Sequence, residues 1–438
     1  MTTDHAMAAR RAHAVGTPRT ASAPAPAPAP VRAASPGRHA TTTGRPPSPS
    51  DDTLDALFTR TAERRPGAVA VRDARGELRF AKAELWAARL ASVLVYSGVQ
   101  LGDPVIIHCD DHQQSLVAQL AVLKAGGVCV PAAYGLGRPE LRKIAAVSGA
   151  STVLCSRSTR EAWPRRCTAL PLDDQETLRR IRTHRLEPAL PLSHPAEAAY
   201  LMISGGRPDG PTGHLVDHHA WQLAVAERIR TAGPAPHRVY VAGPPGGPRA
   251  LSAMWWAFAG GGALCTLPAT GAPAKHDGTA CTAVFSPEEY DSAVESLAIR
   301  PRLVQLLGGP VPDGLVARHF AALPGTRLRA DFAPTDGALP WVSQELTPAW
   351  TTRTPSGALG TAVPHIRVHV MDDRGRPLAL GQAGELCAAG RALPFGAVRR
   401  PGRATQTWED APLLRSGVSA RRLADGGLEL ADPPTTPV

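Results

Sequence analysis

The sequence lacks any apolar run that approaches the roughly 20 residues of a membrane span, and no hydrophobic signal core follows its first residues. These absences predict a cytoplasmic chain without a membrane partner. Aromatic residues are also scarce, at 5% of the 438 residues. The net charge of +10 would suit a nucleic-acid partner, but the arginines are scattered and no basic cluster interleaves with aromatics. We therefore expect no nucleic acid either.

The seven cysteines lack the spacing of a disulfide framework or a zinc site, because no two of them lie close together. Several lie inside apolar runs, such as the run at 105–109 that ends in Cys109. Such positions indicate buried thiols in a reducing compartment. His214, His218 and His219 cluster, but no further ligands stand at metal-binding spacing.

The chain is long enough for more than one subdomain, and its texture changes along its length. Residues 1–50 are rich in Ala-Pro units and poor in acids, so we expect a disordered arm. From 51 to 355, apolar strands alternate with helices, and this pattern indicates parallel sheets covered on both faces. Residues 356–431 show β-hairpin patterns, and 432–438 form a tail. The predicted fold class is α/β, with two α/β subdomains and a small β-barrel-like unit.

A loop at 204–213 resembles a phosphate-binding loop without its phosphate-binding groups. Such loops need glycines, small hydroxyls and a lysine. The glycines are present, but the interior reads Arg207-Pro208-Asp209 and no lysine follows. Proline removes an N–H donor, and aspartate repels phosphate. Arg207 could supply a positive charge; the simpler interpretation is a surface loop in which Arg207 and Asp209 compensate each other.

Four ordered segments carry a family resemblance. Residues 121–131 match "LKAGGAYVP", and Leu307-Gly308-Gly309 with Ala333 to Asp336 resembles "GGE…NxYGPTE". Residues 375–386 match "GRPVPPGxxGEL", and 414–426 align with "YRTGDLxRxLPDG". The chain thus resembles the adenylate-forming (AMP-binding) superfamily, most closely the adenylation domains of nonribosomal peptide synthetases. The resemblance implies the fold of the large N-terminal part of these enzymes.

In that family, ATP and a carboxylate form an acyl-adenylate, which a thiol carrier then accepts. The resemblance implies a vestigial nucleotide site in this chain, with Thr335 at the AMP phosphate and Phe332 stacked on adenine. Asp336 replaces the Mg²⁺-binding glutamate and is a candidate metal ligand, one methylene shorter. The equally open alternative is that these residues are only a strand end and turn. The candidate nucleotide contacts are Ser204, Gly206, Arg207, Thr212, Gly308, Phe332, Thr335 and Asp336.

Other family positions have lost their chemistry. Thr212 replaces the loop lysine, and Val418 replaces the aspartate that binds the ribose hydroxyls. Ala250 aligns with the aspartate that holds the substrate amine, and the neighbouring 254–256 cluster is typical of core packing. The family continues with a lid subdomain that carries the catalytic lysine. We expect this lid to be absent, and we assign no catalytic residue.

These features favour a degenerate adenylation-domain homologue that serves as a binding or scaffold subunit beside a peptide synthetase or related biosynthetic enzyme. The alternative is a divergent ATP-dependent amino-acid or carboxylate ligase, with Mg²⁺ and a lid borrowed from a partner. A third interpretation is a nucleotide- or acyl-binding regulator without turnover. ATP and Mg²⁺ are cofactors only if one of these alternatives holds.

Overall fold

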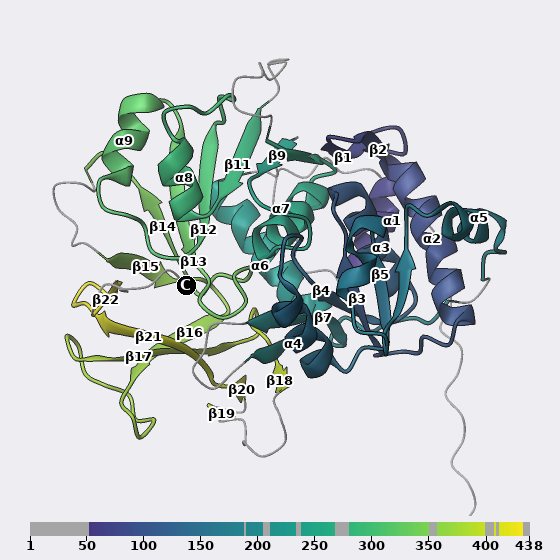
Figure 1. The fold of residues 1–438 in the computed structure, drawn as a ribbon. Helices are drawn as coiled ribbons and strands as arrows, with labels where there is room; N and C mark the ends of the chain where they lie inside the picture. Colours follow the sequence, from purple (N-terminus) through teal and green to yellow (C-terminus); the bar gives the residue numbers. More distant parts are fainter. Residues whose placement is uncertain are drawn as a thin grey trace, which may run out of the picture. The chain divides into compact units, whose positions relative to one another are not determined.

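The computed structural model describes residues 52–187, 190–204, 211–233, 238–267, 280–349, 357–398, 407–408 and 411–431. The expected arm at 1–50, the tail at 432–438 and the loop interior at 205–210 lie outside these ranges. Two large sheets and a set of helices make up the described part (Figure 1).

The first sheet is mostly parallel. Its spatial order is β18 (Gly396–Val398), β8 (Thr212–Asp217), β7 (Ala198–Ser204), β4 (Val128–Pro131), β3 (Pro104–His108), β5 (Thr152–Cys155) and β6 (Thr168–Pro171). Strands β7, β4, β3, β5 and β6 pair in parallel, whereas β8 returns antiparallel beside β7. The interior strand β3 is apolar and buried from Val105 to Ile107, as a sheet buried on both faces requires.

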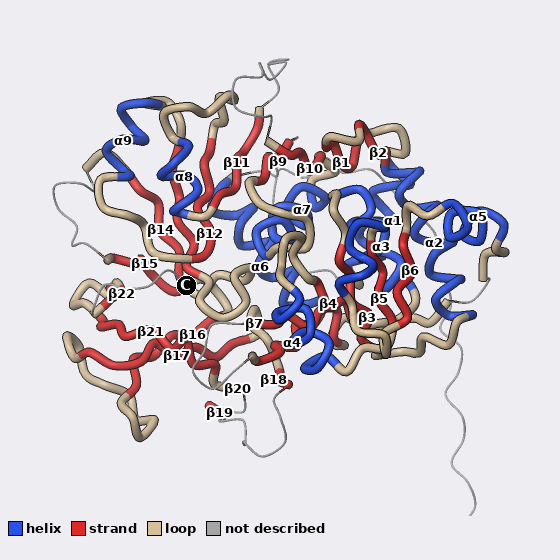
Figure 2. The backbone as a smooth tube through the Cα atoms, in the orientation of Figure 1, coloured by secondary structure: helices blue, strands red, loops and turns tan. Residues whose placement is uncertain are grey.

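The second sheet is larger and changes character along its width (Figure 2). Its order is β16 (Ile366–Met371), β17 (Ala383–Gly390), β21 (Leu414–Arg422), β22 (Leu428–Leu430), β15 (Ala358–Ala362), β14 (Val342–Leu346), β13 (Arg327–Phe332), β12 (Leu303–Gly308), β11 (Cys281–Phe285), β9 (Arg238–Val241), β10 (Ala263–Thr266), β1 (Val69–Asp73) and β2 (Gly76–Arg79). Strands from β13 to β1 are parallel, and the rest are antiparallel. Short β19 (Thr407–Trp408) and β20 (Ala411–Pro412) pair with each other.

Helices contact both sheets. They are α1 (Leu54–Arg64), α2 (Phe80–Tyr96), α3 (His112–Lys124), α4 (Arg138–Ser148), α5 (Gln175–Thr183), α6 (His218–Ala232), α7 (Pro248–Ala259), α8 (Pro287–Ala293) and α9 (Leu315–Ala322), with a 3₁₀ helix η1 (Arg157–Ala162). Helix α3 contacts β3 and β4 of the first sheet and β1 of the second, while α7 contacts β9 and β10. The largest apolar cluster is therefore shared by both sheets.

An aromatic trio shows how this shared core is built. The rings of Phe58 on α1, Phe80 on α2 and Phe258 on α7 meet with centroids 5.0 to 5.6 Å apart. All three are buried, and a fully buried phenylalanine stabilises the fold by about 1.5–3 kcal/mol. The trio therefore ties the start of the described chain to the helix that covers β9 and β10.

The predicted α/β class with two sheets is confirmed, including the hairpin patterns after residue 355. The large sheet continues from the α/β part into the β-rich part, because β14 pairs with β15. The boundaries at 355 and 431 therefore stay predictions. Among the elements that were not predicted from sequence patterns are β8, which forms a hairpin with β7, and helix α5.

Candidate functional site

The predicted phosphate loop joins two paired strands. Ser204 ends β7, Thr212 begins β8, and the two residues face each other in the hairpin register. The Ser204 hydroxyl donates to the Thr212 carbonyl oxygen at 3.4 Å and lies 3.3 Å from His214 Nε2. Gly206 and Arg207 lie outside the described residues. The hydroxyl that would donate to phosphate is thus engaged within the hairpin.

The second group of candidates lies where β12 and β13 end. Gly308 and Phe332 are partners in the parallel register, and the Ala333 N–H donates to the Gly308 carbonyl at 3.0 Å. Gly308 adopts φ 124°, a conformation that favours glycine. Phe332 is 4% exposed and packs in an apolar cluster with Trp341. The ring predicted to stack on adenine is therefore buried in the protein core.

Thr335 and Asp336 form a closed turn directly after β13. Oδ1 of Asp336 accepts the backbone N–H of Ala338 at 2.8 Å and of Leu339 at 2.7 Å. Oδ2 accepts the Thr335 hydroxyl at 3.3 Å. Burial raises the pKa of Asp336 to about 6, although these hydrogen bonds favour the charged form. Both oxygens of the predicted metal ligand thus have partners within the turn.

Val418 lies in β21, at the family position of the ribose-binding aspartate. Its side chain is half-buried and packs against the same apolar cluster that contains Phe332. Its N–H donates to the Ser416 hydroxyl at 2.9 Å. Nearby, Glu385 accepts the Gly417 N–H at 2.9 Å and pairs with Arg415. The carboxylate next to Val418 is thus that of Glu385, and it links β17 to β21.

The predicted substrate-side helix is α7, and its aromatic residues are core residues. Met254, Trp255 and Trp256 are at most 3% exposed. The Trp255 indole N–H donates to the Tyr200 hydroxyl at 2.9 Å, which in turn donates to Gln119 Oε1 at 2.7 Å. This buried network joins α7, β7 and α3. The spacing of Gln119, Tyr200 and Trp255 along the sequence does not indicate that they are in contact.

A buried ion pair was also not predicted from the sequence. Arg228 on α6 and Asp331 on β13 pair at 3.1 Å, and their side chains are 5% and 7% exposed. The guanidinium also hydrogen-bonds Ser252 of α7 and lies 5.3 Å from the centre of the Trp256 ring. Asp331 accepts the Ser343 hydroxyl at 2.7 Å. The signal available in the sequence was a charged residue inside a strand that ends at the candidate site.

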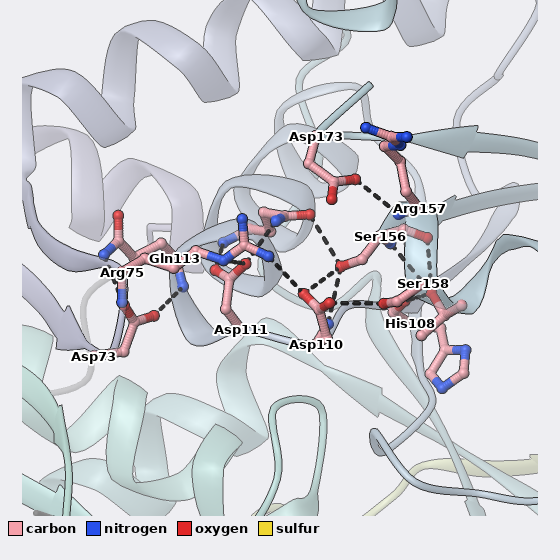
Figure 3. Close-up of polar contacts among 12 residues, drawn as sticks. Asp73, Arg75, His108, Asp110, Asp111, Gln113, Ser156, Arg157, Ser158 and Asp173 are labelled. Carbon is pink, nitrogen blue, oxygen red and sulfur yellow. Dashed lines mark hydrogen bonds and ion pairs between the residues drawn. The ribbon is translucent and has the colours of Figure 1, made fainter. Parts of the chain in front are cut away.

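A separate polar cluster lies at the carboxyl ends of β3 and β5 (Figure 3). Asp110 accepts the hydroxyls of Ser156 at 2.8 Å and Ser158 at 2.6 Å, and Arg75 at 3.1 Å. Arg75 also pairs with Asp111 at 2.8 Å. Burial raises the pKa of Asp110, but the serine hydroxyls and the Arg75 charge outweigh this and lower it. The carboxylates are satisfied locally, so the cluster ties the β1–β2 hairpin to the first sheet.

Neither cluster has the composition of a metal site. Over the ranges that the structure describes, no group of three or more His, Cys, Asp or Glu side chains is arranged to hold a metal ion. In the same part of the chain, no helix combines the length and apolar character that crossing a bilayer requires.

The nucleotide candidates therefore fall into two groups. Gly308, Phe332, Thr335 and Asp336 follow one another at the carboxyl ends of β12 and β13, and Val418 packs against the apolar cluster that contains Phe332. Ser204 and Thr212 lie on the first sheet, at the mouth of the β7–β8 hairpin.

Several peptide synthetases are similar to this chain in sequence. Phosphinothricin tripeptide synthetase PhsB of Streptomyces viridochromogenes is 27% identical over 415 residues, which cover 88% of this chain and 34% of the relative. The probable non-canonical nonribosomal peptide synthetase CymA of Salinispora arenicola is 27% identical over 396 residues, covering 86% of this chain and 5% of the relative. The chain thus spans a minor part of the curated relatives that it matches.

Solved structures show the same fold. VinN superposes with a TM-score of 0.75 at 17% identity, covering 87% of this chain and 99% of that one. The nonribosomal peptide synthetase FmoA3 gives 0.73 at 23% identity, covering 87% and 42%. The N-terminal subdomain of Klebsiella oxytoca NpsA, solved with 3-hydroxybenzoyl-AMSN, gives 0.72 at 17% identity, covering 87% and 100%. The AMP-binding enzyme family model matches residues 58–394, and the chain belongs to that family.

Proposed function

We propose that this chain is a degenerate adenylation-domain homologue that does not form an acyl-adenylate by itself. The observation that carries the proposal is the Thr335–Asp336 turn. A Mg²⁺ ligand needs carboxylate oxygens that face the ion, whereas Asp336 gives both oxygens to hydrogen-bond donors of its own turn. The raised pKa of about 6 indicates a carboxyl group that burial has taken away from solvent.

Two further positions support the proposal. Val418 offers no acceptor for ribose hydroxyls, and a desolvated hydroxyl without a partner loses about 1–3 kcal/mol. In the loop, Thr212 stands in place of a lysine, and its side chain is buried. Each lost charged contact removes about tenfold or more from transition-state binding. Their combined loss favours a chain that keeps the fold without the reaction.

The role that follows is a binding or scaffold subunit in nonribosomal peptide or related specialised-metabolite biosynthesis. The support is that curated relatives of this chain are peptide synthetases. Under this proposal the partner is a peptide synthetase or another biosynthetic protein, and no acyl-adenylate chemistry is required of this chain.

One observation favours the alternative, a divergent carboxylate-activating ligase whose lid comes from a partner. Thr335 and Asp336 keep a hydroxyl and a carboxyl at the family positions. With a pKa of about 6, Asp336 would be ionised at pH 8 and could turn toward a metal. The same chemistry would serve a nucleotide-binding regulator.

The test is substrate-dependent exchange of labelled pyrophosphate into ATP, measured across amino acids and aryl acids. It is run with the chain alone and with candidate partner chains, beside an active adenylation domain as standard. We expect only background exchange under every condition. Exchange above background that depends on one acid, with or without a partner, would establish the ligase instead.

Affinity capture with the full chain from its native host is expected to recover a peptide synthetase, and recovery of no biosynthetic protein would contradict the scaffold role.

A further inference from the structure

A cleft of about 250 Å³ opens at the amino ends of the parallel strands of the large sheet. Arg65 precedes β1, Arg72 lies in β1, and Arg238 begins β9; all three line the cleft. The turn Gly261-Gly262 before β10 forms another wall, and the remaining lining is alanine and valine. Among the described residues that line the cleft there is no carboxylate. The cleft is thus a basic hollow with small, apolar surroundings.

This cleft lies on the opposite edge of the sheet from the candidate nucleotide site. Strands β1, β10, β9, β11, β12 and β13 are mutually parallel. The cleft is at their amino ends, whereas Gly308 and Phe332 stand at the carboxyl ends of β12 and β13. Figure 2 shows β9, β10 and β1 side by side. A ligand in the cleft would therefore not depend on the nucleotide residues.

The guanidinium groups of Arg65 and Arg72 are held in place by hydrogen bonds that do not use all of their donors. Arg65 Nη1 donates to the Gly261 carbonyl at 2.8 Å. Arg72 uses Nε and Nη2 on a single oxygen of Glu77, at 3.0 and 2.5 Å. Because each guanidinium carries five N–H donors, both retain donors for a ligand. Arg238 hydrogen-bonds the Tyr240 hydroxyl, which anchors the third cation beside them.

The glycine turn allows this arrangement. Gly261 has φ 66°, and a Cβ there would lie 3.1 Å from both Cδ and Nη1 of Arg65. Glycine therefore lets the Arg65 side chain lie against the turn, where its guanidinium reaches the cleft. Since a water molecule occupies about 30 Å³ of liquid, the cleft has room for several waters or for one small oxyanion.

We propose that this cleft binds a phosphate group, carried by free phosphate or by a small phosphomonoester. Planar guanidinium forks match the oxygens of phosphate and form strong charge-assisted hydrogen bonds with them. Three arginines from separate segments line the hollow, and the carboxylate that pairs with Arg72, that of Glu77, comes from outside the wall. The cleft is separate from the candidate nucleotide residues. The proposal therefore does not depend on whether those residues bind a nucleotide.

Calorimetric titration of the full chain with inorganic phosphate, and separately with phenyl phosphate, tests the proposal. Titrations are run at pH 7.5 and constant ionic strength, because a change in salt would by itself alter the attraction between the exposed arginines and an anion. We expect saturable binding of one or both probes, and the tighter probe identifies the source of the phosphate group. Arg72→Gln and Arg65→Gln should each weaken binding at least about tenfold. Arg179→Gln, which removes an exposed arginine paired with Glu176 on α5, should leave binding unchanged.

Three results would overturn the site: no saturable binding of either probe, equal binding of acetate, or unchanged binding in both cleft variants. Each variant is first checked for native circular dichroism. If Arg72→Gln fails to fold because its pairing with Glu77 supports the β1–β2 hairpin, Arg65→Gln keeps the test decisive. Arg65 is an exposed residue that precedes β1 and donates to the Gly261 turn, so its loss leaves the strand pairing intact.

Discussion

In the large sheet, the charged side chains at the amino ends of the parallel strands, the amino edge, differ in their partners from those at the carboxyl ends, the carboxyl edge. At the carboxyl edge, Asp331 and Asp336 are buried, and their oxygens accept hydrogen bonds from the protein itself. At the amino edge, Arg65 and Arg72 line an open cleft and keep spare donors. The family resemblance assigns the nucleotide to the carboxyl edge. Polar residue types at a family site therefore do not by themselves indicate ligand binding, because their atoms can be engaged within the protein.

The largest expected effect is at the carboxyl edge. Arg228→Ala leaves Asp331 buried without its partner, and breaking a buried pair destabilises a protein by about 3–5 kcal/mol. Denaturant unfolding followed by fluorescence measures this loss. The matched control is Arg179→Ala, which removes an exposed pair and should leave the free energy of unfolding nearly unchanged. Equal effects of the two substitutions would contradict the structural role of the Arg228–Asp331 pair.

Acid should destabilise the core that both edges share. Burial lowers the pKa of His108, His112 and His218 to about 4, below the ordinary value of 6.5. The unfolded chain therefore binds more protons between these values, so stability is full above pH 6.5 and falls as the pH drops toward 4. Melting temperatures measured from pH 7.5 to 4.5 should decrease steadily. A melting temperature that stays constant over this range would show that these histidines titrate normally.

Restoring a family residue should not restore function. Val418→Asp places a carboxylate against the apolar cluster of Phe332, and we expect a loss of about 1–3 kcal/mol of stability. Pyrophosphate exchange should stay at background in the variant. The isosteric control Val418→Thr exchanges one methyl group for a hydroxyl of similar size and should destabilise the protein less than Val418→Asp does. Pyrophosphate exchange by Val418→Asp that depends on an added amino acid or aryl acid would show that the ribose contact alone had been missing.

The smallest effect is expected at the amino edge. Arg65→Gln removes a cleft cation that is exposed, so its free energy of unfolding should change by only about 0.5 kcal/mol. Thermal unfolding without phosphate measures this, with Arg228→Ala as the sensitive reference. A loss as large as that of Arg228→Ala would show that the cleft arginines are structural, as the carboxyl-edge charges are.

Much of the fold follows from local sequence signals. Ser286 and Glu289 stand at the spacing of a capping box, and α8 opens on one: the Glu289 N–H donates to the Ser286 hydroxyl and the Ser286 N–H to the Glu289 carboxylate. The apolar run at 105–109 lies largely in β3, an interior strand of its sheet. Strand β8 was missed because its residues follow a glycine-rich loop, and its pairing with β7 depends on contacts that a single segment does not reveal.

The candidate site was less predictable than the fold. Residue types at 335 and 336 fit both a metal site and a turn, and only the positions of the Ala338 and Leu339 N–H groups distinguish them. The Arg228–Asp331 pair joins residues about a hundred positions apart, and no local pattern encodes such a contact. The cleft arginines likewise come from separate segments that meet only when β1, β9 and β10 pair.

The proposed loss of adenylation depends most on Asp336, which under this proposal serves its own turn and holds no metal. The direct measurement is the melting temperature of the wild-type chain and of Asp336→Asn between pH 5 and 8, with and without Mg²⁺. Because the pKa of Asp336 is raised to about 6, ionising it opposes folding as the pH rises above its unfolded value. We predict that the stability of Asp336→Asn relative to wild type rises from pH 5 until the pH passes the folded pKa of about 6 and stays constant above it, and that Mg²⁺ changes neither protein. Stabilisation of the wild type by Mg²⁺, lost in Asp336→Asn, would contradict the proposal.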